Sequence, residues 1–294
     1  MTNLAPSIRV AVDPTNPGQF FACCGLLELA DRLWPGAEGW FENDGRQFLI
    51  SSAGTLAELL SSAQQVQFES DSTEEDDESE EDEESDDSED EKANVNVTPI
   101  VFVSPVQLRL DWWNDKSLKP WAGSMNAEKI ALAMCRAIDP MSESPLNQTQ
   151  VVTEVLRQEM GIGKASSKRN KPKPKEPFHF DARRGANALG LDVGFVPDTL
   201  KKAWKVPMHA HPVVEFLCLI GLQRCRPTPT KRPRQFVYFT WITPCLPSLL
   251  PAAVNGLLGD PSARSFRFEN AFRTGQRKHK AFNPAVPVNT GDHP

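Results

Sequence analysis

The stretch NPGQFFACCGLLELADRLW, residues 16–34, decides the fold of the N-terminal half. Asn16 suits a helix N-cap and Pro17 suits the first helical position, so a helix is expected to begin here. Apolar residues recur at three- and four-residue spacing, while the charged residues near the end form a polar side. The pattern predicts a core helix over about residues 17–34. Cys23 and Cys24 fit burial better than thiol chemistry, because no histidine or metal-spaced partner stands nearby.

Short strands and helices are expected on both sides of this helix. Asn43-Asp44-Gly45 suits positive φ and predicts a hairpin. Pro212 opens VVEFLCLIGLQRC, which is apolar almost all round and predicts the central buried helix of the C-terminal half. The remaining strands are expected at residues 8–12, 39–42, 47–51, 98–103, 106–111, 236–242 and 265–269, and the remaining helices at 55–63, 125–138, 150–160 and 249–258.

This order of elements fits an α+β fold, with a mixed or antiparallel sheet packed with helices, better than parallel βαβ units. Residues 1–294 form a single body in this interpretation, with two insertions. Residues 69–91 hold 17 of the 39 acidic residues and predict a disordered acidic insertion. It is either a solubilising segment or a mimic of nucleic-acid phosphates that occupies the basic half. Residues 164–177, which are basic and rich in proline, predict a mobile linker.

Several protein classes lack support in the sequence. The first 20 residues have neither the charged start nor the apolar run of a signal peptide, and no apolar stretch approaches the ~20 residues that span a bilayer. The six cysteines include no CxxC pair and predict reduced, buried thiols. These features predict a cytoplasmic protein without membrane contact. Walker A, GxGxxG and GxSxG motifs are absent, so we expect neither a cofactor nor catalysis.

Charge is distributed unevenly along the chain. The formal net charge is −7, but without residues 69–91 there are 32 Lys/Arg against 22 Asp/Glu, a balance of +10. Residues 161–294 hold 22 Lys/Arg and 8 Asp/Glu, whereas residues 1–160 hold 10 Lys/Arg. A basic C-terminal half favours a polyanionic partner, and an ordinary solvated surface is the alternative.

The segment LDWWNDKSLKPWAG, residues 110–123, interleaves three tryptophans with two lysines. Aromatic faces can stack on bases while ammonium groups contact phosphates. The candidate nucleic-acid contacts here are Trp112, Trp113, Lys116 and Lys119. Tryptophan is costly to expose, so the alternative is that these rings belong to the core.

Paired and clustered cations supply further candidate phosphate contacts. Arg183 and Arg184 stand beside Gly185 and suit close approach to a phosphate backbone, unless Asp181 neutralises an arginine locally. Proline holds the segment RCRPTPTKRPR extended. The other candidates are Lys201, Lys202 and Lys205; Arg224, Arg226, Lys231, Arg232 and Arg234; and the cluster Arg273, Arg277, Lys278 and Lys280.

A metal-dependent nuclease is an alternative hypothesis. It would use His179, Asp181, His209 and His211, since His-x-His and His-x-Asp pairs recur in metal sites. Their spacing fixes no third ligand, and we expect no bound metal.

Four segments together resemble the Csb-three family of type I-U (I-G) CRISPR loci: residues 12–34, LDWW with KPWAG, FDARRGANALGLDVGFVPD and HPVVEFLCLIGLQRCRP. They cover roughly a third of the chain, and none is a catalytic signature. The resemblance implies a non-catalytic subunit of an RNA-guided interference complex in antiviral defence, with cleavage supplied by a separate helicase-nuclease. The implied partners are other subunits of the complex, CRISPR RNA and target DNA, whose backbones proteins hold while guide pairing reads the sequence. The acidic run departs from the family pattern. A scaffolding subunit without nucleic-acid contact is the alternative.

Overall fold

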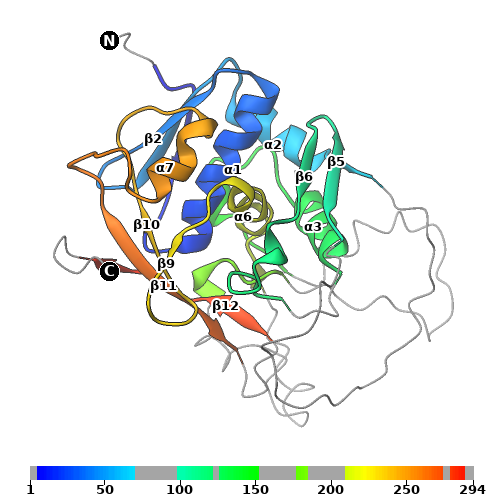
Figure 1. The fold of residues 1–294 in the computed structure, drawn as a ribbon. Coiled ribbons are helices and arrows are strands. Elements are labelled where there is room, and N and C mark those ends of the chain that lie inside the picture. Colours follow the sequence, from blue (N-terminus) through cyan, green and yellow to red (C-terminus); the bar gives the residue numbers. More distant parts are fainter. Residues whose placement is uncertain are drawn as a thin grey trace, which may run out of the picture.

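Helices α1 (Pro17–Leu33) and α6 (Pro212–Arg224) form the centre of the molecule in a computed structural model that describes residues 5–69, 98–121, 126–151, 177–184, 209–273 and 279–288. Figure 1 shows the two helices side by side, with the strands and shorter helices around them. Both begin where the sequence predicts. The Asn16 side chain caps α1 by accepting a hydrogen bond from the Gln19 N–H, and a proline occupies the first turn of each helix.

The close approach of α1 and α6 requires a glycine on each helix. A Cβ added at Gly25 would lie 2.0 Å from the Leu217 carbonyl oxygen. One added at Gly221 would lie 2.0 Å from the Phe21 carbonyl oxygen. Because these neighbours are backbone atoms in a close-packed interior, they cannot move aside without shifting a helix. Gly25 and Gly221 therefore set the spacing of the helix pair.

Short antiparallel sheets surround the helix pair and make the fold α+β, as predicted. The first has the order β1–β3–β2, from Ile8–Ala11, Gln47–Ser51 and Glu38–Glu42. The second has the order β12–β11–β10–β9, from Lys280–Phe282, Ser265–Phe272, Gln235–Phe239 and Thr228–Pro229, and β13 (Val286–Val288) also pairs with β11. The third has the order β4–β5–β6, from Gln67–Phe68, Ile100–Ser104 and Leu108–Leu110. The last pairs β7 (Gln150–Val151) with β8 (His209–Ala210).

Shorter helices complete the described part of the chain. The α-helices are α2 (Leu56–Gln64), α3 (Ala127–Arg136) and α7 (Leu250–Val254), and the 3-10 helices are η1 (Trp112–Asn114), η2 (Pro145–Asn147), η3 (Ala182–Arg184) and η6 (Pro247–Leu249). None of the helices in these ranges is long and apolar enough to cross a membrane.

Aromatic side chains join α1 to the first two sheets. Phe20 stacks on Tyr238 with ring centroids 4.3 Å apart, and it meets Trp241 edge-on at 6.0 Å. The Phe41 N–H of β2 donates to the Trp241 carbonyl oxygen at 2.8 Å, which ties the two sheets together. Buried apolar residues of both halves of the chain form one hydrophobic cluster.

Two helix predictions need correction. Gln150–Val151 form a strand, so the helix predicted at 150–160 does not begin there, and its remainder lies outside the described residues. Helix α7 ends at Val254, well before the predicted residue 258, because Gly256 turns into the left-handed region at φ 72°.

The predicted insertions also begin and end differently. The Glu69 N–H donates to the Val101 carbonyl oxygen at 2.9 Å, so this residue continues the β4–β5 ladder and does not belong to the acidic insertion. Pro177 is buried, so the basic linker ends before it. The rest of both segments lies outside the described residues.

Candidate nucleic-acid interface

The tryptophans expected to act as stacking platforms belong to the core. Trp112 and Trp113 are 0% and 3% exposed, and neither ring offers a face to a base. The Trp112 indole N–H donates to the Leu219 carbonyl oxygen of α6 at 2.9 Å. With Trp121, Phe178 and Phe180 the two rings form one aromatic cluster. The expectation that these two tryptophans contact nucleic acid is therefore wrong, and the core alternative is the one that the structure shows.

The lysines of the same segment meet cations from the C-terminal end of the chain. Lys116 and Lys119 lie in the loop after η1, Arg234 ends the turn between β9 and β10, and Lys280 begins β12. Arg234 and Lys280 lie over the ring of Phe272 at the end of β11, and the Lys280 ammonium donates to the Lys116 carbonyl oxygen. The Asn270 side chain of β11 donates to the Lys119 carbonyl oxygen at 3.5 Å. We call Lys116, Lys119, Arg234, Phe272 and Lys280 the basic hairpin site. The connection between β11 and β12, which carries Arg277 and Lys278, lies outside the described residues.

Phe272 organises two of these cations. The Arg234 guanidinium lies over its ring at 4.5 Å from the centroid, and the Lys280 ammonium lies over it at 5.8 Å. Arg234 Nη2 is also 3.8 Å from the Glu269 carboxylate. Arg234 Nε is buried and has no hydrogen-bond partner among the described residues.

Backbone hydrogen bonds fix the loop against the hairpin. The Lys280 ammonium donates to the Lys116 carbonyl oxygen at 2.9 Å, and the Lys280 N–H donates to the Pro120 carbonyl oxygen at 2.8 Å. The buried Asn270 side chain donates to the Ser117 carbonyl oxygen at 2.8 Å, while its N–H donates to the Arg234 carbonyl oxygen at 2.9 Å. The cations are therefore held on ordered backbone rather than on free loops.

The electrostatics of this site favour an anion. Partial burial lowers the pKa of Lys119, and the nearby ammonium of Lys116 lowers it further. Lys119 also lies 5.4 Å from the centroid of the Trp121 ring. Glu269 lies beside Arg234, and Asp115 accepts a hydrogen bond from the Ser117 N–H in the loop after η1. The four cations of the site outnumber these two carboxylates. A phosphate group would relieve the repulsion between the lysines.

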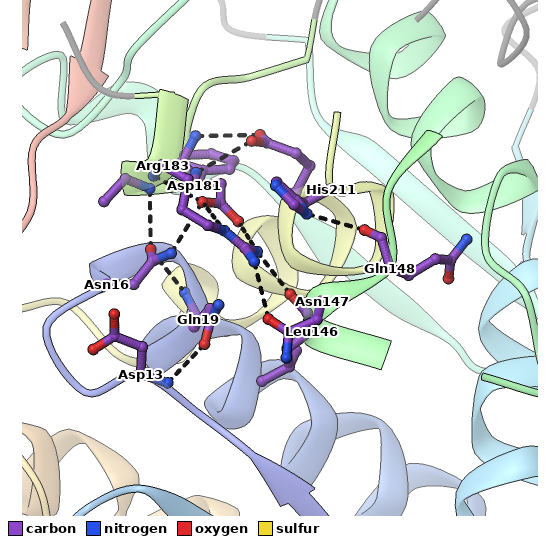
Figure 2. A network of polar contacts seen from close by, with 12 residues as sticks. Asp13, Asn16, Gln19, Leu146, Asn147, Gln148, Asp181, Arg183 and His211 are labelled. Carbon is purple, nitrogen blue, oxygen red and sulfur yellow. Dashed lines mark hydrogen bonds and ion pairs between the residues drawn. The ribbon is translucent and has the colours of Figure 1, made fainter. Parts of the chain in front are cut away.

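Arg183 follows the alternative in which a nearby acid neutralises it. Its guanidinium donates to both oxygens of Asp181, at 2.9 and 2.6 Å, and also to Asn147 and to the Leu146 carbonyl oxygen (Figure 2). Asp181 is fully buried and accepts a further hydrogen bond from the Asn16 side chain. This network joins the start of α1 to η2 and η3. Arg183 thus has a structural role, and a third of its side chain remains exposed.

Three of the four residues of the metal hypothesis already have polar partners in the structure. Burial would raise the pKa of Asp181, but hydrogen bonds from Arg183 and the electrostatic interaction with His211 lower it. The carboxylate is therefore ionised and already paired with Arg183. His211 Nδ1 lies 3.0 Å from the Gln148 carbonyl oxygen, and His179 Nε2 lies 2.7 Å from Arg273 Nη1. Within the described residues no three His, Cys, Asp or Glu side chains are grouped to hold a metal ion. The side chain of His209 lies outside them.

Other predicted contacts lie elsewhere on the molecule. Glu28 holds Arg224 at 2.6 Å and Arg32 at 2.7 Å, which neutralises part of that charge. Burial would raise the pKa of Glu28, whereas the two arginines lower it. Arg226, Lys231 and Arg232 are exposed between α6 and β10, and Arg232 lies two residues before Arg234 of the basic hairpin site. Lys201, Lys202, Lys205 and the side chain of Arg184 lie outside the described residues.

Sequence reasoning missed three arginines that lie in β11 or near its beginning. Arg46 follows the β2–β3 turn, Arg264 precedes β11, and Arg267 lies within it. Arg46 follows the polar turn Asn43-Asp44-Gly45, and Arg264 and Arg267 stand among apolar or small residues. None of them belongs to a run of cations, so a search for runs of charge could not find them. Strand alternation in SFRFENAF was the available signal, since it puts Arg267 on the face opposite to Phe266 and Phe268.

The chain matches no family model, no curated protein and no solved structure.

Proposed function

We propose that this protein is a non-catalytic subunit of a type I-U (I-G) CRISPR RNA-guided interference complex and that its basic hairpin site holds the phosphate backbone of guide RNA or target DNA. The observation that carries backbone binding is the convergence of Lys116, Lys119, Arg234 and Lys280 from three segments distant in sequence. Membership of the complex rests on the four segments that resemble the Csb-three family.

The chemistry of the site suits a backbone better than bases. Lysine and arginine contacts to phosphate position a nucleic acid without reading its sequence. The aromatic rings nearby are buried or covered by cations, so they do not offer a face on which a base could stack. In an RNA-guided complex this division of labour is sufficient, because pairing with the guide supplies the specificity.

A salt titration tests the binding site. A triple variant, Lys116→Gln, Arg234→Gln and Lys280→Gln, replaces three cations by uncharged polar side chains. On labelled single-stranded RNA we expect the slope of log affinity against log salt to become shallower by about 2, at ~0.7 for each phosphate that is no longer neutralised.

Lys129→Gln is the matched control, because Lys129 is exposed on α3, away from the site. It removes one charge and should leave the slope nearly unchanged. If the triple variant and the control behave alike while both remain folded, the basic hairpin site does not bind the backbone.

Co-expression tests membership of a complex. The tagged protein is produced with the products of its neighbouring genes and a CRISPR array, and the co-eluting proteins and RNA are identified. A stable particle with short, uniform guide RNAs is expected. Assembly that occurs without any nucleic acid and persists in the triple variant would instead favour a scaffolding subunit.

A further inference from the structure

A pocket lies near the beginning of β11. Asp13, Thr15, Arg46, Arg264 and Phe266 line it, together with Pro14 and Pro287, around a volume of about 290 Å³. Arg264 precedes β11 and Phe272 of the basic hairpin site ends it, so strand geometry separates these two residues by about 27 Å. We call the pocket the Arg46 pocket, and it is independent of the basic hairpin site.

The walls of this pocket are fixed before any ligand arrives. The buried Tyr238 hydroxyl donates to the Pro14 carbonyl oxygen at 2.7 Å, and the Ala285 N–H donates to the Thr15 carbonyl oxygen at 2.7 Å. On the opposite wall the Val12 N–H donates to the Arg46 carbonyl oxygen at 2.9 Å. A ligand would therefore meet an ordered backbone around the pocket, so binding would require little ordering of the main chain.

Two arginines line this pocket without a carboxylate partner among the described residues. Arg264 is oriented by its hydrogen bond to the Asp44 carbonyl oxygen, at 3.1 Å, and by the Phe266 ring, 5.7 Å from its centre. Arg46 belongs to the turn that closes the β2–β3 hairpin, and its N–H donates to the Asn43 carbonyl oxygen at 3.0 Å. Paired guanidinium groups bind phosphate oxygens through several parallel hydrogen bonds.

Asp13 adds an acceptor to the same pocket. Its Oδ1 atom accepts hydrogen bonds from the Thr15 N–H, at 2.9 Å, and from the Thr15 hydroxyl, at 2.7 Å. Oδ2 accepts none from the described residues. Figure 2 shows this carboxylate turned away from the network around Asp181, while the Asp13 N–H donates to Gln19. The second oxygen therefore suits a ligand hydroxyl.

We infer that the Arg46 pocket binds a ribonucleotide, with its phosphate on Arg46 and Arg264 and its ribose 2′-hydroxyl donating to Asp13. A carboxylate is a common acceptor for a ribose 2′-hydroxyl, and this hydroxyl is what separates RNA from DNA. Pro14 and Pro287 supply the apolar contact that the sugar requires. The volume is near the lower end of ligand pockets, which suits one nucleotide rather than a longer stretch.

Nuclear magnetic resonance of the full chain tests the inference, with uridine 5′-monophosphate, its 2′-deoxy analogue and inorganic phosphate as probes. We expect the ribonucleotide to shift the amide resonances of Thr15, Arg46 and Arg264, and to bind roughly tenfold or more tightly than the deoxynucleotide, which lacks one hydrogen bond to a charged acceptor. Arg46→Gln should lower the affinity for both nucleotides by a similar factor. Lys129→Gln, the control, should change neither.

Asp13→Asn makes the test specific to the ribose. Asparagine can still accept the hydrogen bond from the Thr15 N–H, so the turn is retained, but its side chain is a poorer acceptor for the 2′-hydroxyl. The ratio of ribonucleotide to deoxynucleotide affinity should fall to near one. Equal affinities for the two nucleotides in the wild type, phosphate binding as tight as nucleotide binding, or no shift at millimolar nucleotide would each overturn the inference. The triple variant of the basic hairpin site should keep this binding, which separates the two proposals.

Discussion

Arg234 has a backbone conformation that residues other than glycine rarely adopt. Its φ is 60°, in the left-handed region, where a non-glycine residue costs about 1–3 kcal/mol. This conformation accompanies a guanidinium that lies on Phe272, next to Lys280. At the scale of single residues, a strained backbone at a candidate site is expected where the function needs that residue's side chain.

Replacing Arg234 by glycine should separate stability from binding. Glycine tolerates positive φ, so relief of about 1 kcal/mol offsets the removal of the cation–ring interaction, and the free energy of unfolding should stay nearly constant. Affinity for single-stranded RNA should fall by about 1–3 kcal/mol at low salt. Urea unfolding and fluorescence anisotropy measure the two quantities.

Asn43→Gly is the control for relief of strain, since Asn43 has φ 51° in the exposed β2–β3 turn. It should leave RNA binding unaltered. Undiminished binding by Arg234→Gly would mean that this arginine serves the hairpin alone.

Lys119 should make RNA binding depend on alkaline pH. Burial and Lys116 lower its pKa below the ordinary value of 10.5, whereas a bound phosphate favours the charged ammonium. The complex must then take up a proton once the pH exceeds the pKa of the free protein, so affinity falls as the pH rises through that value. Lys119→Arg, which stays charged, should flatten the dependence. Identical dependence of affinity on alkaline pH in both proteins would contradict this assignment.

At the scale of elements, the helix pair carries the strongest prediction about stability. Alanine normally favours a helix over glycine by about 1 kcal/mol. Gly25→Ala should nevertheless destabilise the protein by about 1–3 kcal/mol or more, because its Cβ would meet the Leu217 carbonyl oxygen at 2.0 Å. Urea unfolding provides the measurement. Ser62→Ala changes a half-buried residue of α2 outside the α1–α6 crossing, and it should alter the free energy of unfolding by no more than about 1 kcal/mol. A Gly25→Ala protein as stable as the wild type would disprove the close crossing.

Strong local signals predict the elements well. The cap and proline at 16–17 locate α1, Pro212 locates α6, and the Asn43-Asp44-Gly45 turn locates the β2–β3 hairpin, all through interactions within a few residues. The errors come from tertiary contacts. Gln150–Val151 pair with β8, about 60 residues further along the chain, and this partner overrides the local helix pattern.

At the scale of the whole molecule, the site itself is beyond sequence reasoning. Lys116, Arg234 and Lys280 stand out in the sequence as cations, but only the packing of the β9–β12 sheet against the loop after η1 brings them together near Phe272. Phe272 carries no signal of its own in the sequence. The charge of a segment is readable from composition, whereas its neighbours across the fold are not.

The acidic run should weaken nucleic-acid binding through its charge. Changing the 16 acidic residues of 70–91 to their amides keeps the length and moves the formal charge from −7 to +9. Affinity for RNA should rise, most strongly at low salt, and the gain should shrink as salt shortens the screening length to ~10 Å at 0.1 M. A salt series of binding isotherms checks this. Equal affinities at the lowest salt would leave the run with a solubilising role.

The most direct measurement is photo-crosslinking of RNA to protein in the co-expressed particle, followed by mass spectrometry of the crosslinked peptides. We predict crosslinked nucleotides on peptides that contain Lys116, Phe272 or Lys280, and their disappearance in the triple variant while the particle still assembles. Crosslinks confined to other surfaces, or a particle in which this protein contacts no RNA or DNA, would contradict the proposed role of the basic hairpin site.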